Sequence, residues 1–174
     1  MKKQLCAPFS EAEIRNLSAG DQISLSGIVY TGRDAAHKRL VNMLDNGENL
    51  PVDLNGQAIY FVGPCPAPPG RPIGSAGPTT SGRMDAYSPR IIAECGLRAM
   101  IGKGDRSQAV KDAMKEYGCV YFAATGGAGA LIAKAIINAE VVAFDDLGPE
   151  AIYKLELKDL PLVVAIDAKG NSLY

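Results

Sequence analysis

Helix and strand patterns alternate through the second half of the sequence, and this alternation restricts the fold more than any other feature. Apolar periodicity predicts strands at 98–101, 119–124 and 140–144, with helices at 108–117 and 129–138 between them. Strands joined through helices run parallel, because the crossover is right-handed and packs back onto the same sheet. This half of the sequence therefore predicts an α/β fold with a parallel sheet covered by helices.

The other segments extend this to a mixed sheet. Two apolar stretches at the end of the chain predict a closing pair of strands, more typical of an antiparallel arrangement. In the first half, strands are expected at 22–30, bulged or bent at Gly27, and at 57–62. A capping box at Ser10 predicts a short first helix, and Asp34 is expected to cap a second one. The closing stretches are 152–157 and 162–166, and a further helix is expected at 88–94.

The length and charge of the chain exclude several classes. At 174 residues and 47% hydrophobic content, we expect a single domain over 1–174. A net charge of -1 lacks the basic excess of a nucleic-acid binder. No apolar run reaches the roughly 18 residues of a membrane span, and early polar residues interrupt any signal peptide. Four separated cysteines (Cys6, Cys65, Cys95 and Cys119) indicate a reduced, cytoplasmic chain without its own metal site, with Cys95 and Cys119 in the core.

Three glycine-containing turns, each expected before a helix, carry cations. They are 31–34 with Arg33, 77–83 with Arg83, and 102–107 with Lys103, and the second follows a loop at 63–78 rich in proline and glycine. Such turns meet at the carboxyl ends of sheet strands, where helix N-termini favour anions. Two arginine forks and a lysine suit a small dicarboxylate. Ordinary surface cations are the alternative.

Hydroxyl groups lie next to one of these cations. Thr79, Thr80 and Ser81 precede Arg83, and a hydroxyl there can donate to substrate or move a proton, although a helix cap is the simpler interpretation. Asp85 can orient Arg83 or favour the helix dipole.

Two further features are weaker. The glycines at 126–129 match no nucleotide-binding motif and favour close helix packing. His37 is interpreted as a solvated helix residue, with a proton carrier at the edge of the site as the less favoured alternative.

The segment 77–85, Gly-Pro-Thr-Thr-Ser-Gly-Arg-Met-Asp, resembles the signature of the iron–sulfur hydro-lyase β family. This family comprises the β subunit or C-terminal domain of class I fumarate hydratase and L(+)-tartrate dehydratase. The segments 31–37, 101–105 and 125–129 are similar to the family's other motifs, so the resemblance covers essentially the whole chain. It implies a swivelling β/β/α domain, and an α subunit or N-terminal domain that binds a [4Fe-4S] cluster through its cysteines.

The same resemblance implies roles for individual residues. Thr79 and Lys103 are predicted to be catalytic, with proton transfer assigned to the threonine, and Arg33, Arg83 and Thr80 are predicted to bind substrate. The reaction implied is the reversible hydration of fumarate to L-malate, in a hetero-oligomer that is active only with the α subunit. Dehydration of tartrate or a related hydroxy-diacid is the alternative, and a non-catalytic anion-binding module or a purely structural partner also stays open.

Overall fold

The computed structural model describes residues 2–64, 67–74, 76–124 and 129–174. The strands are β1 (Lys2–Ala7), β2 (Gln22–Thr31), β3 (Ala58–Tyr60), β4 (Ala99–Gly102), β5 (Val120–Ala124), β6 (Ile136–Ala143) and β7 (Ile152–Ile166). The α-helices are α1 (Glu11–Arg15), α2 (Asp34–Asp45), α3 (Ser88–Cys95), α4 (Gln108–Tyr117) and α5 (Gly129–Lys134), and the 3-10 helices are η1 (Ser81–Met84) and η2 (Asp145–Glu150).

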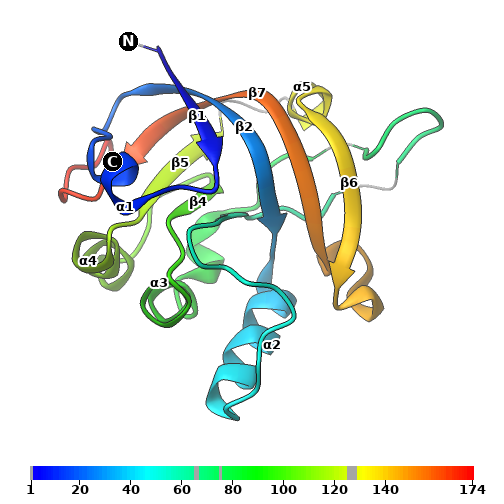
Figure 1. Ribbon diagram of the computed structural model, residues 1–174, viewed down its shortest axis with the longest axis horizontal. Helices are drawn as coiled ribbons and strands as arrows, with labels where there is room; N and C mark the ends of the chain where they lie inside the picture. Colours follow the sequence, from blue (N-terminus) through cyan, green and yellow to red (C-terminus); the bar gives the residue numbers. More distant parts are fainter. Residues whose placement is uncertain (1, 65–66, 75, 125–128) are drawn as a thin grey trace.

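The strands form one mixed sheet that closes on itself. Its order is β1-β2-β3-β4-β5-β7-β6, and an additional pairing joins β7 to β2. β1 to β5 run parallel to one another, whereas β7 runs antiparallel to β2, β5 and β6. The ring β2-β3-β4-β5-β7 is therefore closed, with β1 and β6 attached outside it (Figure 1). A closed ring leaves fewer strand edges to protect from pairing with other chains.

Alternation along the central strands divides the core into two clusters. On β3, Tyr60 belongs to the cluster with Leu25, Ile101 and Phe122. Its neighbour Ile59 belongs to the second cluster, which also contains buried residues of α2, α3 and α4. Figure 1 shows these three helices gathered along one side of the sheet. The period of two in a strand thus builds one core from strands and another between strands and helices.

Most of the predicted elements are confirmed. α4 follows β4 and β5 follows α4 as expected, and α3 has its proline in the first turn and ends at Gly96. β2 has its irregularity between Leu25 and Gly27. Gly27 has φ +101°, and a Cβ there would lie 2.5 Å from the carbonyl oxygen of Ala7 on β1. The glycine is thus required both by the backbone conformation and by the close approach of β1.

The end of the sheet differs from the prediction. The helix expected over 129–138 ends at Lys134, and β6 begins at Ile136 and is antiparallel rather than parallel. The run Ile-Ile-Asn-Ala-Glu-Val-Val is rich in β-branched residues, which favour the strand once β7 is available to pair. The two strands expected as a closing pair form one continuous strand, β7. Within β7 the backbone is irregular at Asp159, which has φ +53°.

Two smaller expectations at the beginning of the chain are also corrected. Residues 2–7, for which no strand was predicted, form β1. Asp34 does not cap α2: Arg33 is the N-cap residue, it makes no side-chain cap hydrogen bond, and Asp34 begins the helix. In the described parts of the chain, none of the helices has the length and apolar character needed to cross a bilayer.

Candidate functional site

The predicted site residues follow three neighbouring parallel strands. β2 ends at Thr31, β3 at Tyr60 and β4 at Gly102, and the three are adjacent in the sheet. Arg33 follows β2 after Gly32, and Lys103 follows β4 directly. The carboxyl ends of parallel strands meet at one edge of a sheet, where α/β proteins commonly bind ligands.

The threonine segment lies between the ends of β3 and β4. Thr79 donates its N–H to the carbonyl of Phe61 at 2.7 Å, and Thr80 forms an isolated parallel bridge with Lys103. The Ser81 N–H donates to the carbonyl of Lys103 at 2.9 Å. Lys103, which is distant from Thr79 and Thr80 in sequence, is thus their neighbour at this edge.

Arg83 connects this segment to the first turn. Its Nε and Nη2 both lie 2.9 Å from Oδ2 of Asp34, the residue after Arg33. The Arg83 side chain is 54% exposed, so the guanidinium remains open to solvent at the rim of the site. Arg33, Asp34 and Arg83 therefore bring the first two predicted turns together.

Two polar atoms in this corner are buried without a hydrogen-bond partner among the described residues. They are Nε of Arg33 and Oδ1 of Asp34. The Arg33 side chain lies against Gly63, because a Cβ on that glycine would be 2.9 Å from Arg33 Cδ and 3.0 Å from its Nη1. A buried polar atom without a partner is costly, and such atoms cluster where a ligand or partner supplies the missing bond.

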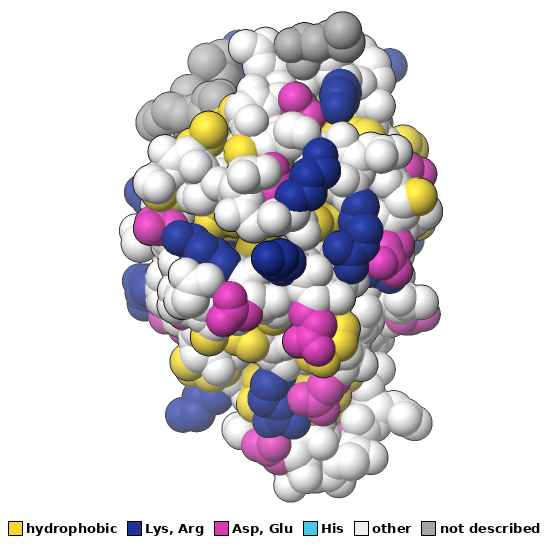
Figure 2. Space-filling view, turned by 90° about the vertical axis from the view of Figure 1, so that its left-hand side faces the viewer, with side chains coloured by type: hydrophobic (Ala, Val, Ile, Leu, Met, Phe, Trp, Pro, Cys, Tyr) yellow, Lys and Arg dark blue, Asp and Glu magenta, His cyan; other side chains and the backbone are white. Residues whose placement is uncertain are grey.

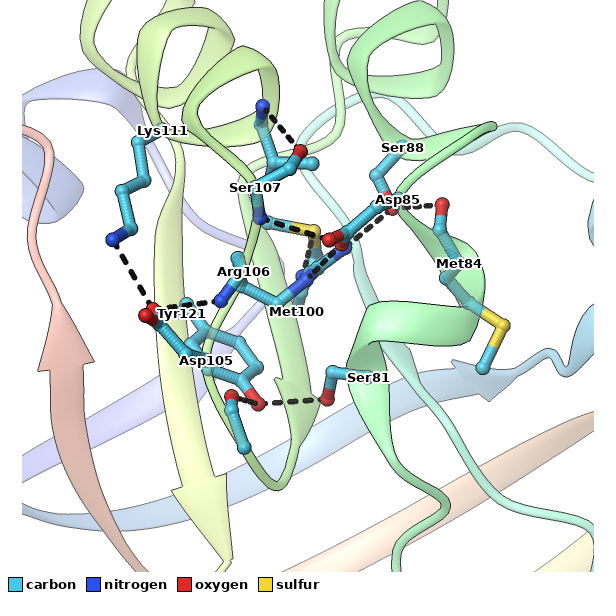
Figure 3. A network of polar contacts seen from close by, with 12 residues as sticks. Ser81, Met84, Asp85, Ser88, Met100, Asp105, Arg106, Ser107, Lys111 and Tyr121 are labelled. Atoms are coloured by element: carbon cyan, nitrogen blue, oxygen red, sulfur yellow. Dashed lines mark hydrogen bonds and ion pairs between the residues drawn. The ribbon is translucent and has the colours of Figure 1, made fainter. Parts of the chain in front are cut away.

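A third arginine, which was not predicted from the sequence, lies beneath the surface. Arg106 is 4% exposed, and its Nε donates to Asp85 Oδ1 at 2.7 Å while its Nη2 donates to Ser88 Oγ at 2.8 Å (Figure 3). Asp85 also accepts from the N–H of Ser107 at 2.8 Å. The prediction that Asp85 orients Arg83 or serves the helix dipole is wrong: Asp85 pairs with Arg106, because the buried guanidinium requires an anionic partner.

The Arg106 guanidinium also lies between two aromatic rings. It is 5.1 Å from the ring centre of Phe61 and 5.2 Å from that of Tyr121. These contacts join the end of β3, the strand β5 and the start of α4 through one side chain. The backbone under the exposed cations is therefore fixed by a buried, fully paired charge.

Ser81 begins η1 and is completely buried. Its Oγ accepts from the N–H of Lys103 at 3.0 Å and lies 2.7 Å from the Tyr121 hydroxyl, which is also 2.8 Å from the carbonyl of Gly104. Burial raises the pKa of Tyr121 above its usual range, so the phenol stays protonated. These contacts join η1, β5 and the lysine turn in one network (Figure 3).

His37 is buried at 1% exposure, so its interpretation as a solvated helix residue is wrong. Its Nδ1 lies 2.9 Å from the carbonyl of Arg33, and its ring meets Phe61 edge to face. The pKa of His37 is lowered to about 4, mainly by burial; the hydrogen bond to Arg33 opposes this shift and nearby Arg106 adds to it. Since a carbonyl only accepts, the neutral ring carries its proton on Nδ1. At neutral pH it stabilises the Arg33 turn.

Other sequence predictions have mixed outcomes. The helix-cap alternative for the threonines is not supported, since Thr80 is the N-cap residue of η1 and makes no side-chain cap bond. Cys119 is buried in the core as predicted, and burial raises its pKa to about 12, whereas Cys95 is only half-buried at the edge of a core cluster. Cys65, Gly126, Gly127 and Ala128 lie outside the described residues.

Arg106 and Tyr121 were not predicted as site residues from the sequence, and Ser81 was predicted only as one of three hydroxyls. A signal for Arg106 was available, because Asp85 closes the signature segment and required a cationic partner. Tyr121 gave a weaker signal, as the one polar-tipped residue within the apolar β5 pattern.

The surface charges are of both signs. Figure 2 shows lysine and arginine side chains interspersed with aspartate and glutamate on the face at the left of Figure 1, over α1 and α4. Mixed charges of this kind are typical of an ordinary solvated surface.

Comparison with known families agrees with this geometry. The family model described as Fumarase C-terminus matches residues 2–174. The chain belongs to the fumarase C-terminus family. The segments that follow β2, β3 and β4, together with both core clusters, fall within the matched region.

Two similar proteins are named as class I fumarate hydratases. The chain is 41% identical over 177 residues to "Fumarate hydratase class I, aerobic" of Escherichia coli K12, covering all of this chain and 32% of the relative. It is 43% identical over 174 residues to "Putative fumarate hydratase class I" of Geobacillus stearothermophilus, covering 98% of this chain and 33% of that one. The chain thus spans about a third of the length of these relatives.

The third relative is shorter. "Putative L(+)-tartrate dehydratase subunit beta" of Methanocaldococcus jannaschii is 39% identical over 171 residues, which cover 95% of this chain and 88% of the relative. This chain therefore corresponds to about a third of each fumarate hydratase and to most of the tartrate dehydratase subunit.

Proposed function

We propose that this chain is the β part of an iron–sulfur hydro-lyase that interconverts fumarate and L-malate. The observation that carries the proposal is the arrangement of cations and hydroxyls at the carboxyl ends of β2, β3 and β4. The bridge between Thr80 and Lys103, and the ion pair between Arg83 and Asp34, bring the predicted residues to one edge. A dicarboxylate offers two anionic groups, which matches a site with several separated cations.

Each predicted residue has a role that its chemistry supports. Arg33 and Arg83 hold the substrate carboxylates, since a guanidinium fork matches a carboxylate in two-point contact. Lys103 supplies a compact positive charge and Thr80 contacts the substrate. Thr79 moves the proton through its hydroxyl.

The ion pair of Arg83 supports a binding role. Both donors are directed to a single oxygen of Asp34, and the pair is partly exposed, so a substrate carboxylate can compete for the fork. The buried and unpartnered Nε of Arg33 is a further donor that a bound anion can satisfy.

The cluster implied by the family resemblance does not fit the described residues of this chain. In those residues no group of three or more His, Cys, Asp or Glu side chains is arranged to hold a metal ion. Cys6 is exposed, Cys119 is buried in the core, and Cys95 lies at its edge. We therefore assign the [4Fe-4S] cluster to an α subunit or N-terminal domain.

The wider proposal follows from this division. The chain acts as one swivelling β/β/α domain over 1–174 that brings its cations to the cluster-bearing partner, within a cytoplasmic hetero-oligomer. The mixed, closed sheet with helices on one side is compatible with such a domain.

Tartrate or a related hydroxy-diacid is the second candidate substrate. It is favoured by the Methanocaldococcus jannaschii relative, whose name contains both tartrate dehydratase and subunit beta. A hydroxy-diacid and a diacid present the same carboxylates to the arginines, so this edge of the sheet accommodates either.

The test separates the chain from its partner. Treated anaerobically with iron and sulfide, the chain alone should gain no stoichiometric [4Fe-4S] absorbance and should hydrate no fumarate. Assembled with a cluster-bearing partner, it should consume fumarate, and kcat/KM for fumarate and tartrate then identifies the substrate. A stoichiometric cluster on the chain alone would overturn the assignment to a partner.

A further inference from the structure

The backbone of Lys103 is held from both sides by one buried residue. The Ser81 N–H donates to the Lys103 carbonyl at 2.9 Å, and the Lys103 N–H donates to Ser81 Oγ at 3.0 Å. The Lys103 side chain is exposed, whereas Ser81 is fully buried. The exposed side chain of Lys103 therefore extends from a backbone that is held in place by hydrogen bonds.

Tyr121 extends this contact into a directed chain of hydrogen bonds. Its hydroxyl lies 2.7 Å from Ser81 Oγ and 2.8 Å from the carbonyl oxygen of Gly104. A phenol has one proton and a carbonyl can only accept, so Tyr121 donates to Gly104 and Ser81 donates to Tyr121. The bonds then run from the Lys103 amide through both hydroxyls to the Gly104 carbonyl, and they enclose the Lys103–Gly104 peptide.

Both hydroxyl groups are shielded from water and closely packed. Ser81 and Tyr121 are both at 0% exposure, so water does not compete for their hydroxyls. A Cβ on Gly102 would lie 1.9 Å from Ser81 Oγ, so the strand end is packed directly against the serine. Arg106 covers the other side of Tyr121.

We propose that Ser81 and Tyr121 form a hydroxyl relay that positions Lys103 and its bridge partner Thr80 for the reaction. Both are positioning residues, because each acts through the lysine turn. The proposal rests on the proposed function, in which Lys103 acts on the substrate.

The first measurement compares Tyr121→Phe, Ser81→Ala and the double variant in the assembled hydro-lyase. Each single variant should lower kcat about tenfold and leave KM within about threefold, because the arginines that hold the carboxylates are unchanged. The double variant should be no slower than the slower single variant, since breaking either bond interrupts the same relay.

Ser24→Ala is the matched control. Ser24 is also a buried serine, at 1% exposure, but its hydroxyl contacts Asp159 on β7 at 3.3 Å. It should lower the melting temperature by as much as Ser81→Ala does, with kcat unchanged. An equal loss of kcat in Ser24→Ala would show that removing any buried serine hydroxyl lowers the rate through general destabilisation, and it would overturn the proposal.

The second measurement uses the chain without its partner. Ser81→Ala removes the acceptor of the Lys103 amide, so hydrogen exchange at that amide should be at least about tenfold faster. The Phe61 amide donates instead to the carbonyl of Ile101 at 2.9 Å and should exchange as in the unmodified chain. Unchanged exchange at Lys103 would show that Ser81 does not hold it.

Lys103→Ala separates failure of the relay from failure of the proposed function. If Lys103→Ala abolishes activity while Tyr121→Phe and Ser81→Ala keep full kcat, the relay is overturned and the function stands. If Lys103→Ala is fully active, the function assigned to the lysine is overturned, and the relay loses its role with it.

Discussion

Two arginines near the same strand ends show how differently one residue type is used in this molecule. Arg83 is 54% exposed and pairs with Asp34 at the surface, whereas the Arg106 side chain is fully buried and pairs with Asp85. Arg83 can exchange its partner for a ligand at small cost, because an exposed ion pair contributes little to stability. Arg106 cannot, because a buried charge must keep its partner. The exposed layer, with Arg83, is suited to bind a ligand. The buried layer, with Arg106, holds the backbone beneath the exposed residues in place.

The sharpest test of the exposed layer is Thr79→Ala. If Thr79 transfers a proton, kcat of the assembled enzyme should fall by roughly 10²–10⁴ with the melting temperature nearly unchanged. Thr79→Ser keeps the oxygen and should recover part of the rate. Measuring kcat and melting temperature on the same preparations decides the question, and an active but destabilised Thr79→Ala variant would contradict the catalytic assignment.

Arg106→Ala tests the buried layer and should act on stability first. It leaves the Asp85 carboxylate without its charged partner and removes the side chain packed on Phe61 and Tyr121. The free energy of unfolding, measured with urea, should fall by about 3–5 kcal/mol. Arg90→Ala is the control, since Arg90 makes two ion pairs at the surface and its removal should hardly move the urea midpoint. Equal effects of the two variants would end the distinction between layers.

The residues of the exposed layer could be predicted from the sequence, whereas the buried layer could not. Arg33, Thr79, Arg83 and Lys103 could be found because glycine-rich turns before helices have local signals and because the signature segment resembles a known family. Arg106 could not be recognised as buried, since its partners come from positions 61, 85, 88 and 121. Burial of a charge depends on tertiary neighbours, which no local pattern contains.

For the fold too, local sequence patterns predicted some elements and missed those that depend on tertiary pairing. The elements from β4 to β5 followed from periodicity and caps, because local propensity and tertiary pairing agree there. The helix predicted past Lys134 is wrong because pairing with β7 overrides the local pattern, and ring closure through β2 and β7 joins residues about 130 positions apart. Residues 2–7 pair with β2 although no strand was predicted there.

Arg83→Lys sharpens the comparison within the exposed layer. Lysine keeps the charge and loses the fork, so kcat/KM of the assembled enzyme should fall by roughly a hundredfold if Arg83 makes a two-point contact with a carboxylate. The melting temperature should stay close to that of the unmodified enzyme, because only an exposed ion pair is altered. A change in kcat/KM below about threefold would leave Arg83 as an ordinary surface residue.

The smallest expected effect concerns His37, which links the layers through the Arg33 turn. Its pKa is lowered to about 4 in the folded protein from 6.5, mainly by burial, with Arg106 lowering it and Asp34 raising it. The unfolded chain therefore binds more protons below pH 6.5, so the stability contributed by the neutral ring is complete above that pH and is lost as the pH falls toward 4. Between pH 7.5 and 5.0, where most carboxylates remain ionised, this linkage amounts to about 2 kcal/mol of unfolding free energy. His37→Gln has no titrating ring, so its urea midpoint should change much less over the same interval, even if its stability at pH 7.5 is lower. If both proteins lose stability equally between these pH values, His37 is not the group that titrates, and the acid sensitivity belongs to the exposed ion pairs.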